Sequence, residues 1–540
     1  MFRFINSESK TIVGAATIVG VLSFVSRIIG LVRDRILAGE FGAGNVLDVY
    51  YAAFKVPDFL FSLIVTGAIS ASFIPMFVKY FYEGGGKEKA WKLMNNTLHL
   101  VVAAMILLSV ILLIFAGPLA TVVAPGFPLP KQMDVASFMR VMFLAQVILG
   151  GSVVLGSALQ GMKRFALYSL APILYNVGII IGALWFVDIL GPIGLAWGVV
   201  LGAFLHFLVQ LYGALGAGYA YKWSFQWKDK DTQKILRLAG PRVLGIGISQ
   251  VNFLMYTIIA TTLAVGSVTI FQFAYNIQFF AVGIIGISYA IAVFPTFSEY
   301  LAKKDFDSFR YIFSSTVRQV LFFMIPAMIL FLIVRAQIVR VVVGAGQFDW
   351  AATIMTADTL AFFTFSFVPQ ALVFILARAF FALHDTVTPL TAGVTAAILG
   401  LVSAMWLSGE FGVIGLAMAY TISAIVNAAL LWVPLRQKVG SLDEERILQT
   451  LFKITTAGVA GAVVMQALKP AVVGVVSLTT FWGVFSQGFV AGGAGILVYV
   501  VIAKLLGTEE LEVIIAGMRK RILKKAAPEE AVHTESPTAS

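Results

Sequence analysis

Residues 23–34 read SFVSRIIGLVRD, and apolar residues surround this stretch from Thr11 to Val49. A run of this length is long enough for a helix to cross a hydrocarbon core of about 30 Å. Similar runs recur along the whole chain. They do not alternate between polar and apolar residues, as the strands of a membrane β-barrel do. The sequence therefore predicts an all-α polytopic membrane protein.

The composition agrees with this class. Of the 540 residues, 60% are hydrophobic and 12% are charged, whereas soluble proteins carry about 25% charged residues. The net charge of +11 fits the tendency of basic residues to gather in cytoplasmic loops, so no nucleic-acid partner is expected. The chain contains no cysteine, which excludes disulfides, thiolate metal sites and cysteine nucleophiles.

The apolar runs predict about 14 transmembrane helices. Their approximate positions are 11–38, 49–81, 92–123, 134–161, 166–188, 191–219, 238–264, 268–300, 312–343, 351–383, 388–408, 411–436, 449–467 and 480–505. Lys and Arg are concentrated in the loops after even-numbered spans, for example at Lys163 and Arg164. Basic residues favour cytoplasmic loops, so we expect both termini in the cytoplasm.

Two stretches repeat about 220 residues later in the chain. GAGNVLDVYYAAF at 42–54 resembles AVGSVTIFQFAYN at 264–276, and GPIGLAWGVVLGA at 191–203 resembles GVIGLAMAYTISA at 412–424. Six predicted spans separate the copies, so the repeats share one orientation. We therefore expect two parallel six-helix lobes, residues 1–220 and 221–440. Two further helices in 441–510 and a basic, disordered cytoplasmic tail in 511–540 follow them.

The lobe arrangement favours a transporter that works by alternating access. The competing class is a membrane scaffold that keeps such a fold without moving a substrate. The chain has no HExxH, dinucleotide-binding or P-loop motif, so we do not expect an enzyme. Its four histidines are scattered without metal-ligand spacing, and neither a metal nor a cofactor is expected.

The first span carries the candidate binding residues. On a helix, Arg27, Gly30 and Asp34 share one face, while Ser26, Gly30 and Arg33 share an adjoining face. A charge at the bilayer centre costs about 2.5–3.5 kcal/mol on insertion scales, so this face is expected to line a polar cavity. Arginine suits phosphate because its planar fork donates two hydrogen bonds at once. A structural ion pair between Arg33 and Asp34 remains an alternative.

Further polar residues interrupt later spans. Lys55 adds a cation to the first lobe, or it forms a salt bridge with Asp58 three residues later. Arg378 is equally suited to lining the cavity and to reaching the membrane surface. For His206 we favour an interhelical hydrogen bond over proton coupling. Asp385 and Thr386 are expected to cap the helix that follows them.

Several motifs together carry a family resemblance. SRIIGLVRDRILAGEFGAGNVLDVYYAAFKVPDFL, at 26–60, resembles the start of the MurJ/MviN family of lipid II flippases. GAISASFIPMF at 67–77, LQGMKRFALYSLAPILYN at 159–176 and ARAFFALHDTVTP at 377–389 extend the resemblance. It covers essentially the whole chain, in order.

The resemblance implies a fold of the MOP exporter superfamily. It further implies that the protein moves the undecaprenyl-pyrophosphate-linked peptidoglycan precursor, lipid II, across the bacterial inner membrane for cell-wall synthesis and cell shape. The resemblance also implies that the membrane potential drives transport and that the last two helices form a groove for the lipid tail. Cell-wall synthesis proteins are the implied partners. The family's cavity charges fall on Arg27, Arg33 and Asp34, its acid after the first span on Asp48, and its lysine on Lys55.

The chain also departs from the family pattern. Phe61, Thr66 and Asn276 stand where the family commonly has charged residues. The alternative substrate is therefore another lipid-linked oligosaccharide. Our hypothesis is that a pyrophosphate binds to four residues and that four others shape or gate the cavity. The binding residues are Arg27, Arg33, Lys55 and Ser26, and the cavity or gating residues are Asp34, Gly30, Asp48 and Arg378.

Overall fold

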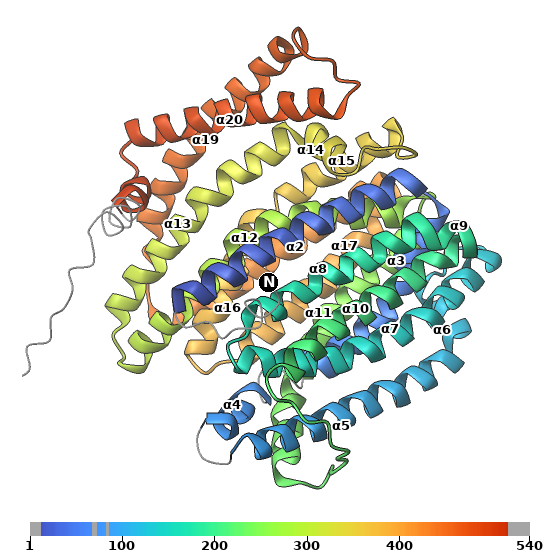
Figure 1. The fold of residues 1–540 in the computed structure, drawn as a ribbon. Coiled ribbons are helices and arrows are strands. Elements are labelled where there is room, and N and C mark those ends of the chain that lie inside the picture. Colours follow the sequence, from blue (N-terminus) through green and yellow to red (C-terminus); the bar gives the residue numbers. More distant parts are fainter. Residues whose placement is uncertain (1–11, 67–72, 83–85, 517–540) are drawn as a thin grey trace, which may run out of the picture.

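The computed structural model describes residues 12–66, 73–82 and 86–516, without the side chains of 12–16, 66, 236, 238–246 and 248–249. The predicted start of the first span at Thr11, part of the 67–77 motif, the side chain of Thr66 and the tail from 517 onward lie outside this part. The described residues form helices joined by loops, the longest of which connects α10 to α11, with no strand among them (Figure 1).

The helices follow the predicted apolar runs. The α-helices of the first half are α2 (Ile12–Phe41), α3 (Asn45–Phe61), α4 (Ile74–Tyr82), α5 (Gly86–Ile114), α6 (Ala116–Val123), α7 (Leu129–Gly161), α8 (Phe165–Ile181), α9 (Val187–Leu190) and α10 (Gly194–Leu215). Those of the second half are α11 (Lys230–Thr261), α12 (Ser267–Ala302), α13 (Phe306–Ile333), α14 (Arg335–Val342), α15 (Trp350–Thr364), α16 (Phe367–Ala382), α17 (Val387–Phe411), α18 (Val413–Val439), α19 (Glu444–Val473) and α20 (Phe481–Leu505).

Nine helices of the described part are long and apolar enough to cross a membrane. A tenth span results when α15 and α16, bent by 44° at their junction, are taken together. The protein is therefore an all-helical membrane protein with several spans. The span predicted at 49–81 is interrupted, because α3 passes into a π-helix, η1 (Ser62–Thr66), before α4 begins.

One candidate span, Phe165–Leu215, is a helical hairpin. A Cβ atom on Gly178 would lie 2.2 Å from the backbone nitrogen of Gly202, and one on Gly182 would lie 2.4 Å from the Cα of Gly198. The sequence numbers rise on one helix as they fall on the other, so α8 and α10 pack in antiparallel orientation. Small residues four apart allow such close approach in membranes, and this run therefore contributes two spans.

Gly198→Ala is expected to destabilise the hairpin by about 1–3 kcal/mol, as overpacking of a close contact does. The added Cβ would lie 2.6 Å from the Cα of Gly182, a backbone atom with little room to move. Thermal unfolding in detergent would measure the loss. Gly393→Ala, in α17, is the matched control because no atom lies within 4 Å of its added Cβ. Equal melting temperatures for the two variants would contradict this packing.

The last two helices lie along one edge of the bundle, next to α13, whereas α5 and α6 lie along the opposite edge (Figure 1). Salt bridges fasten this edge, since Arg318 of α13 lies 2.9 Å from Glu509 and also contacts the buried Glu510. The hydrogen bond from Arg318 to Glu509 lowers the pKa of the Glu509 carboxyl. The segment after α20 is thus held against α13 by charge as well as by packing.

Of the two predicted capping residues, Asp385 caps α17, whereas Thr386 makes no side-chain capping hydrogen bond. Oδ1 of Asp385 accepts hydrogen bonds from the backbone nitrogens of Val387, at 3.0 Å, and Thr388, at 2.9 Å. Lys438 of α18 donates to Oδ2 of the same carboxylate. Burial alone would raise the pKa of Asp385, but hydrogen bonds from Lys438 and Thr388 hold it well below its usual value. The turn between α16 and α17 is therefore tied to the end of α18.

Candidate substrate cavity

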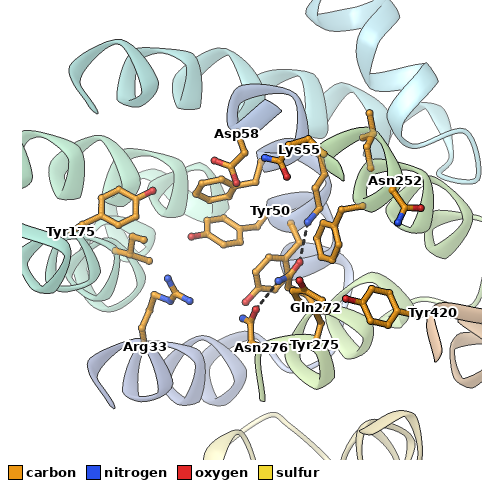
Figure 2. Close-up of a pocket in the computed structure, with 16 residues that line it drawn as sticks. Arg33, Tyr50, Lys55, Asp58, Tyr175, Asn252, Gln272, Tyr275, Asn276 and Tyr420 are labelled. Carbon is orange, nitrogen blue, oxygen red and sulfur yellow. Dashed lines mark hydrogen bonds between the residues drawn. The ribbon is translucent and has the colours of Figure 1, made fainter. Parts of the chain in front are cut away.

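A cavity of about 630 Å³ lies between helices of the two halves of the chain. Its walls come from α2, α3 and α8 on one side and from α11, α12 and α18 on the other (Figure 2). We call it the central cavity. The lining residues labelled in Figure 2 are Arg33, Tyr50, Lys55, Asp58, Tyr175, Asn252, Gln272, Tyr275, Asn276 and Tyr420.

Arg33 and Asp34 form an ion pair beside this cavity. Nη2 of Arg33 lies 2.7 Å from Oδ1 of Asp34, and Nη1 donates to Oδ1 of Asn176 at 2.9 Å. The other carboxylate oxygen of Asp34 accepts a hydrogen bond from Asn276 of α12 at 3.0 Å. Asp34 is only 3% exposed. The ion pair therefore joins α2 to both halves, while Arg33 still lines the cavity.

Lys55 reaches across the central cavity from α3. Its Nζ donates to Oε1 of Gln272 at 2.9 Å and lies 4.2 Å from the ring centroid of Phe253. The amide of Gln272 in turn donates to Asn276 at 2.8 Å (Figure 2). The alternative salt bridge to Asp58 is absent from the described residues, and Asp58 accepts a hydrogen bond from Gln146 instead. A continuous polar chain thus runs from Lys55 to Arg33 through α12.

Arg27 and Ser26 line a different cavity of about 520 Å³, which we call the second cavity. It is enclosed mainly by α2, α7, α8 and α10. The guanidinium of Arg27 points toward α12, since a Cβ on Gly283 would lie 3.0 Å from its Nη1. Gly30 has no atom within 4 Å of an added Cβ. The structure therefore separates Arg27 from Arg33 and Lys55, which the sequence placed in one site.

Asp48 lies outside both cavities, where it joins α3 to the beginning of α12. Its Oδ2 accepts hydrogen bonds from the backbone nitrogen of Gly266, at 2.8 Å, and from Nζ of Lys131, at 3.2 Å. Its Oδ1 accepts from the backbone nitrogen of Thr269, at 3.1 Å, and from its hydroxyl, at 2.8 Å. An acidic group at a helix N-terminus is stabilised by the helix dipole. These contacts form a latch between the two halves, which we call the Asp48 latch.

The C-terminal end of α2 contacts the loop between α14 and α15, at the end of the molecule that also contains Asp48. The carbonyl of Gly39 accepts a hydrogen bond from the backbone nitrogen of Gln347 at 2.8 Å. Nη1 of Arg35 donates to the carbonyls of Arg340 and Val341, at 3.2 and 2.7 Å. Together with the Asp48 latch, these contacts join the two halves beside the connection between α2 and α3.

The remaining predicted residues, Arg378 and His206, contact neighbouring side chains of the fold. Arg378 does not line either cavity, and its guanidinium lies 5.5 Å from the ring centroid of Phe294 and 5.9 Å from that of Phe381. Nδ1 of His206 lies 2.6 Å from the hydroxyl of Ser152, which is the predicted interhelical hydrogen bond. The described residues contain no group of three or more His, Asp and Glu suited to a metal ion.

The sequence missed the amide side chains that organise the central cavity. Asn176, Gln272 and Asn276 bind the ionic groups, yet they lie on three runs of otherwise apolar residues. Asn276 was identified only as a missing family charge, although its amide holds Asp34. Polar residues within a membrane span are the one signal that marks such positions.

The chain matches the family model described as "Lipid II flippase MurJ" over residues 37–485. A probable lipid II flippase MurJ of Vibrio cholerae is 28% identical over 523 residues, which cover 92% of this chain and 97% of that relative. A lipid II flippase MurJ of Burkholderia cenocepacia is 27% identical and covers 77% of this chain and 82% of its own.

Solved structures agree on the fold. A lipid II flippase MurJ in an inward closed conformation aligns with a TM-score of 0.74 at 21% identity, covering 90% of this chain and 98% of that one. An inward-facing multidrug resistance transporter of the MATE family, in the MOP superfamily, aligns with a TM-score of 0.67 at 14% identity, covering 79% and 99%. The chain therefore belongs to the lipid II flippase MurJ family, whose members are membrane transporters and not enzymes.

Proposed function

We propose that the protein moves lipid II from the inner to the outer leaflet by alternating access, with the pyrophosphate bound in the central cavity. The observation that carries this proposal is the polar chain from Lys55 to Arg33, which crosses between the two halves. The cavity volume of about 630 Å³ falls within the range of small-molecule sites, about 300–1,000 Å³. The lipid tail would remain in the bilayer while the headgroup crosses.

Lys55 and Arg33 are the cationic residues that line the central cavity in the described part. Lys55 is held by the amide oxygen of Gln272, and Arg33 by that of Asn176 as well as by the Asp34 carboxylate. A phosphate oxygen forms stronger, charge-assisted hydrogen bonds than an amide does. An arriving pyrophosphate would therefore displace these amides. Displacing Gln272 would break the polar chain, which gives substrate binding a direct route to the contact between the halves.

We further propose a fourteen-span topology with two six-helix lobes, residues 1–220 and 221–440. In it α3, η1 and α4 form one span, α8 and α10 form two, and α15 with α16 forms one. Both termini and the tail of residues 511–540 would be cytoplasmic. The helices of residues 441–510, α19 and α20, would hold the lipid tail. Their place at the edge of the bundle supports that role (Figure 1).

Opening of the cavity to the outer leaflet would require the Asp48 latch to break, since it joins α3 and α7 to α12. Gly30 leaves open space beside α2, and Arg378 would stabilise the cytoplasmic end of α16. The setting would be the bacterial inner membrane, with the phospholipid bilayer and cell-wall synthesis proteins as partners and no nucleic acid.

Translocation of fluorescently labelled lipid II by the full-length protein in proteoliposomes tests this function. We expect faster transfer to the opposite leaflet than in protein-free vesicles. A lipid-linked oligosaccharide with a different sugar, tested in parallel, addresses the alternative substrate suggested by Phe61, which lines the second cavity. Transfer of that lipid without transfer of lipid II would overturn the proposal. Transfer of neither lipid would favour a scaffold.

A further inference from the structure

The second cavity contains polar groups that the folded chain leaves unpaired. The hydroxyl of Ser169 and Oε1 of Gln210 have no hydrogen-bond partner, although these residues are only 4% and 1% exposed. A buried polar atom without a partner costs about 1–3 kcal/mol. Such atoms are uncommon in folded proteins and call for an explanation. Both residues line the same cavity, so rotation of these two side chains would turn both atoms toward a ligand there.

A glycine in α7 leaves room for the side chain of Gln210. A Cβ on Gly156 of α7 would lie 3.1–3.3 Å from the amide nitrogen, carbon and oxygen of Gln210, which is a close contact. Nε2 of Gln210 reaches the carbonyl of Tyr168 at 3.4 Å, so its oxygen is the free end of the amide. Gly156 thus allows the Gln210 amide to pack against α7.

The wall of the second cavity is suited to a ligand rich in hydroxyl and amide groups that carries one anionic group. Apart from Arg27, the described lining residues carry no fixed charge and no carboxylate. The absence of acidic groups argues against a metal cation. The polar lining groups are amides, hydroxyls and one imidazole, namely those of Gln160, Gln210, Ser157, Ser169, Tyr168 and His206.

Arg27 lines the second cavity, and its guanidinium lies on the side of α12, next to Gly283. It has no ion pair with any described residue, in contrast to Arg33. Arg27 and Arg33 are six residues apart on α2, which corresponds to about 9 Å along the helix axis. A pyrophosphate with one attached sugar can span this separation. The two cavities can therefore receive neighbouring parts of one headgroup.

We propose that the second cavity is a sugar subsite, in which Ser169 and Gln210 bind the hydroxyl and amide groups of the headgroup sugar while Arg27 faces an adjacent anionic group. This subsite rests on the proposed function, because it assumes that the pyrophosphate occupies the central cavity. It assigns the unpaired atoms of α8 and α10 to recognition of the sugar, which the pyrophosphate contacts do not provide.

Two ligands and two sets of variants test the subsite. Lipid II carries the sugars, whereas undecaprenyl pyrophosphate shares its tail and pyrophosphate but has no sugar. Binding of each would be measured with the full-length protein in nanodiscs. Ser169→Ala and Gln210→Leu are each expected to weaken lipid II binding about three- to tenfold, the usual effect of one hydrogen bond. Binding of undecaprenyl pyrophosphate should change less than about twofold.

Melting temperatures separate recognition from folding. The Ser169 hydroxyl has no partner in the protein, so Ser169→Ala is expected to leave the melting temperature unchanged or raised. Ser403→Ala is the matched control, because this exposed hydroxyl bonds only to the Leu399 carbonyl of its own helix. It should affect binding of neither ligand.

The outcomes distinguish the subsite from the proposed function. If Ser169→Ala and Gln210→Leu weakened the binding of both ligands equally, the subsite would be overturned. Unchanged lipid II binding in both variants would overturn it as well. Selective weakening of lipid II supports it. If the wild-type protein bound neither ligand, the proposed function would fail, and the subsite that rests on it would fail with it. Lys55→Ala should weaken both ligands, because it acts on the shared pyrophosphate.

Discussion

Asp48→Ala is expected to reduce lipid II translocation at least tenfold and to lower the free energy of unfolding by about 3–5 kcal/mol, the cost of removing one partner of a buried ion pair. Asp48 is 1% exposed and accepts four hydrogen bonds, from Lys131, Gly266 and Thr269. Its removal leaves Lys131, itself 8% exposed, without an ionic partner. The first turn of α12 also loses its acceptor.

Opening of the latch can be measured directly, because the chain has no cysteine. Val268→Cys, in the first turn of α12, places one thiol at a site that is 3% exposed. A membrane-impermeant thiol reagent should label this position in intact cells faster when Asp48→Ala is also present. Melting temperature and proteoliposome translocation complete the comparison.

Asp188→Ala is the control for loss of a carboxylate, since Asp188 is exposed at the start of α9. It should change neither labelling nor translocation. Asp48→Asn should be milder than Asp48→Ala, because the amide oxygen still accepts a hydrogen bond while the charge is lost. Wild-type translocation and labelling by Asp48→Ala would exclude the latch as a step in transport.

The helices were predictable from the sequence because apolar runs of membrane length leave few alternatives. The α8–α10 hairpin was less obvious, although glycines four residues apart at Gly194, Gly198 and Gly202 are a signal of close helix packing. The π-helix η1 was not predicted, since a local widening of the helix leaves no periodic pattern. The bend between α15 and α16 was not predicted either, because it lies within one continuous apolar run.

The candidate site was predicted in part. Helix geometry placed Arg27 and Arg33 on adjoining faces, but six residues also move the side chain about 9 Å along the axis. That displacement, together with the rotation, puts the two residues in separate cavities. The partners of the charges were not predictable, because Asn176 and Asn276 lie on helices remote in sequence from Asp34 and Arg33. Only the folded chain brings them together.

Lys55→Ala is expected to reduce lipid II translocation at least tenfold while changing the unfolding free energy by no more than about 1 kcal/mol. Its Nζ donates to Gln272 and faces the ring of Phe253. After truncation, Gln272 keeps its hydrogen bond to Asn276. Little of the fold is therefore lost, whereas one of the two cations offered to the pyrophosphate is removed.

Arg33→Ala should reduce translocation as strongly as Lys55→Ala does, but it should lower the free energy of unfolding much more. It would leave the buried Asp34 carboxylate without its ion-pair partner, which costs about 3–5 kcal/mol. Asp34 keeps only the hydrogen bond from Asn276 among its described side-chain contacts. A loss of transport by Arg33→Ala thus mixes binding with folding. Lys55→Ala separates them and is the sharper test.

The comparison of Lys55→Ala with Lys55→Arg and Lys504→Ala completes the argument. Arginine keeps the charge and should retain part of the activity, while Lys504, exposed in the last turn of α20, should be dispensable. Proteoliposome translocation and melting temperature would be measured for all three. A scaffold requires no cation in the cavity, so it predicts wild-type behaviour for Lys55→Ala. A stable Lys55→Ala protein that no longer moves lipid II would instead require that the cavity charge act on the substrate.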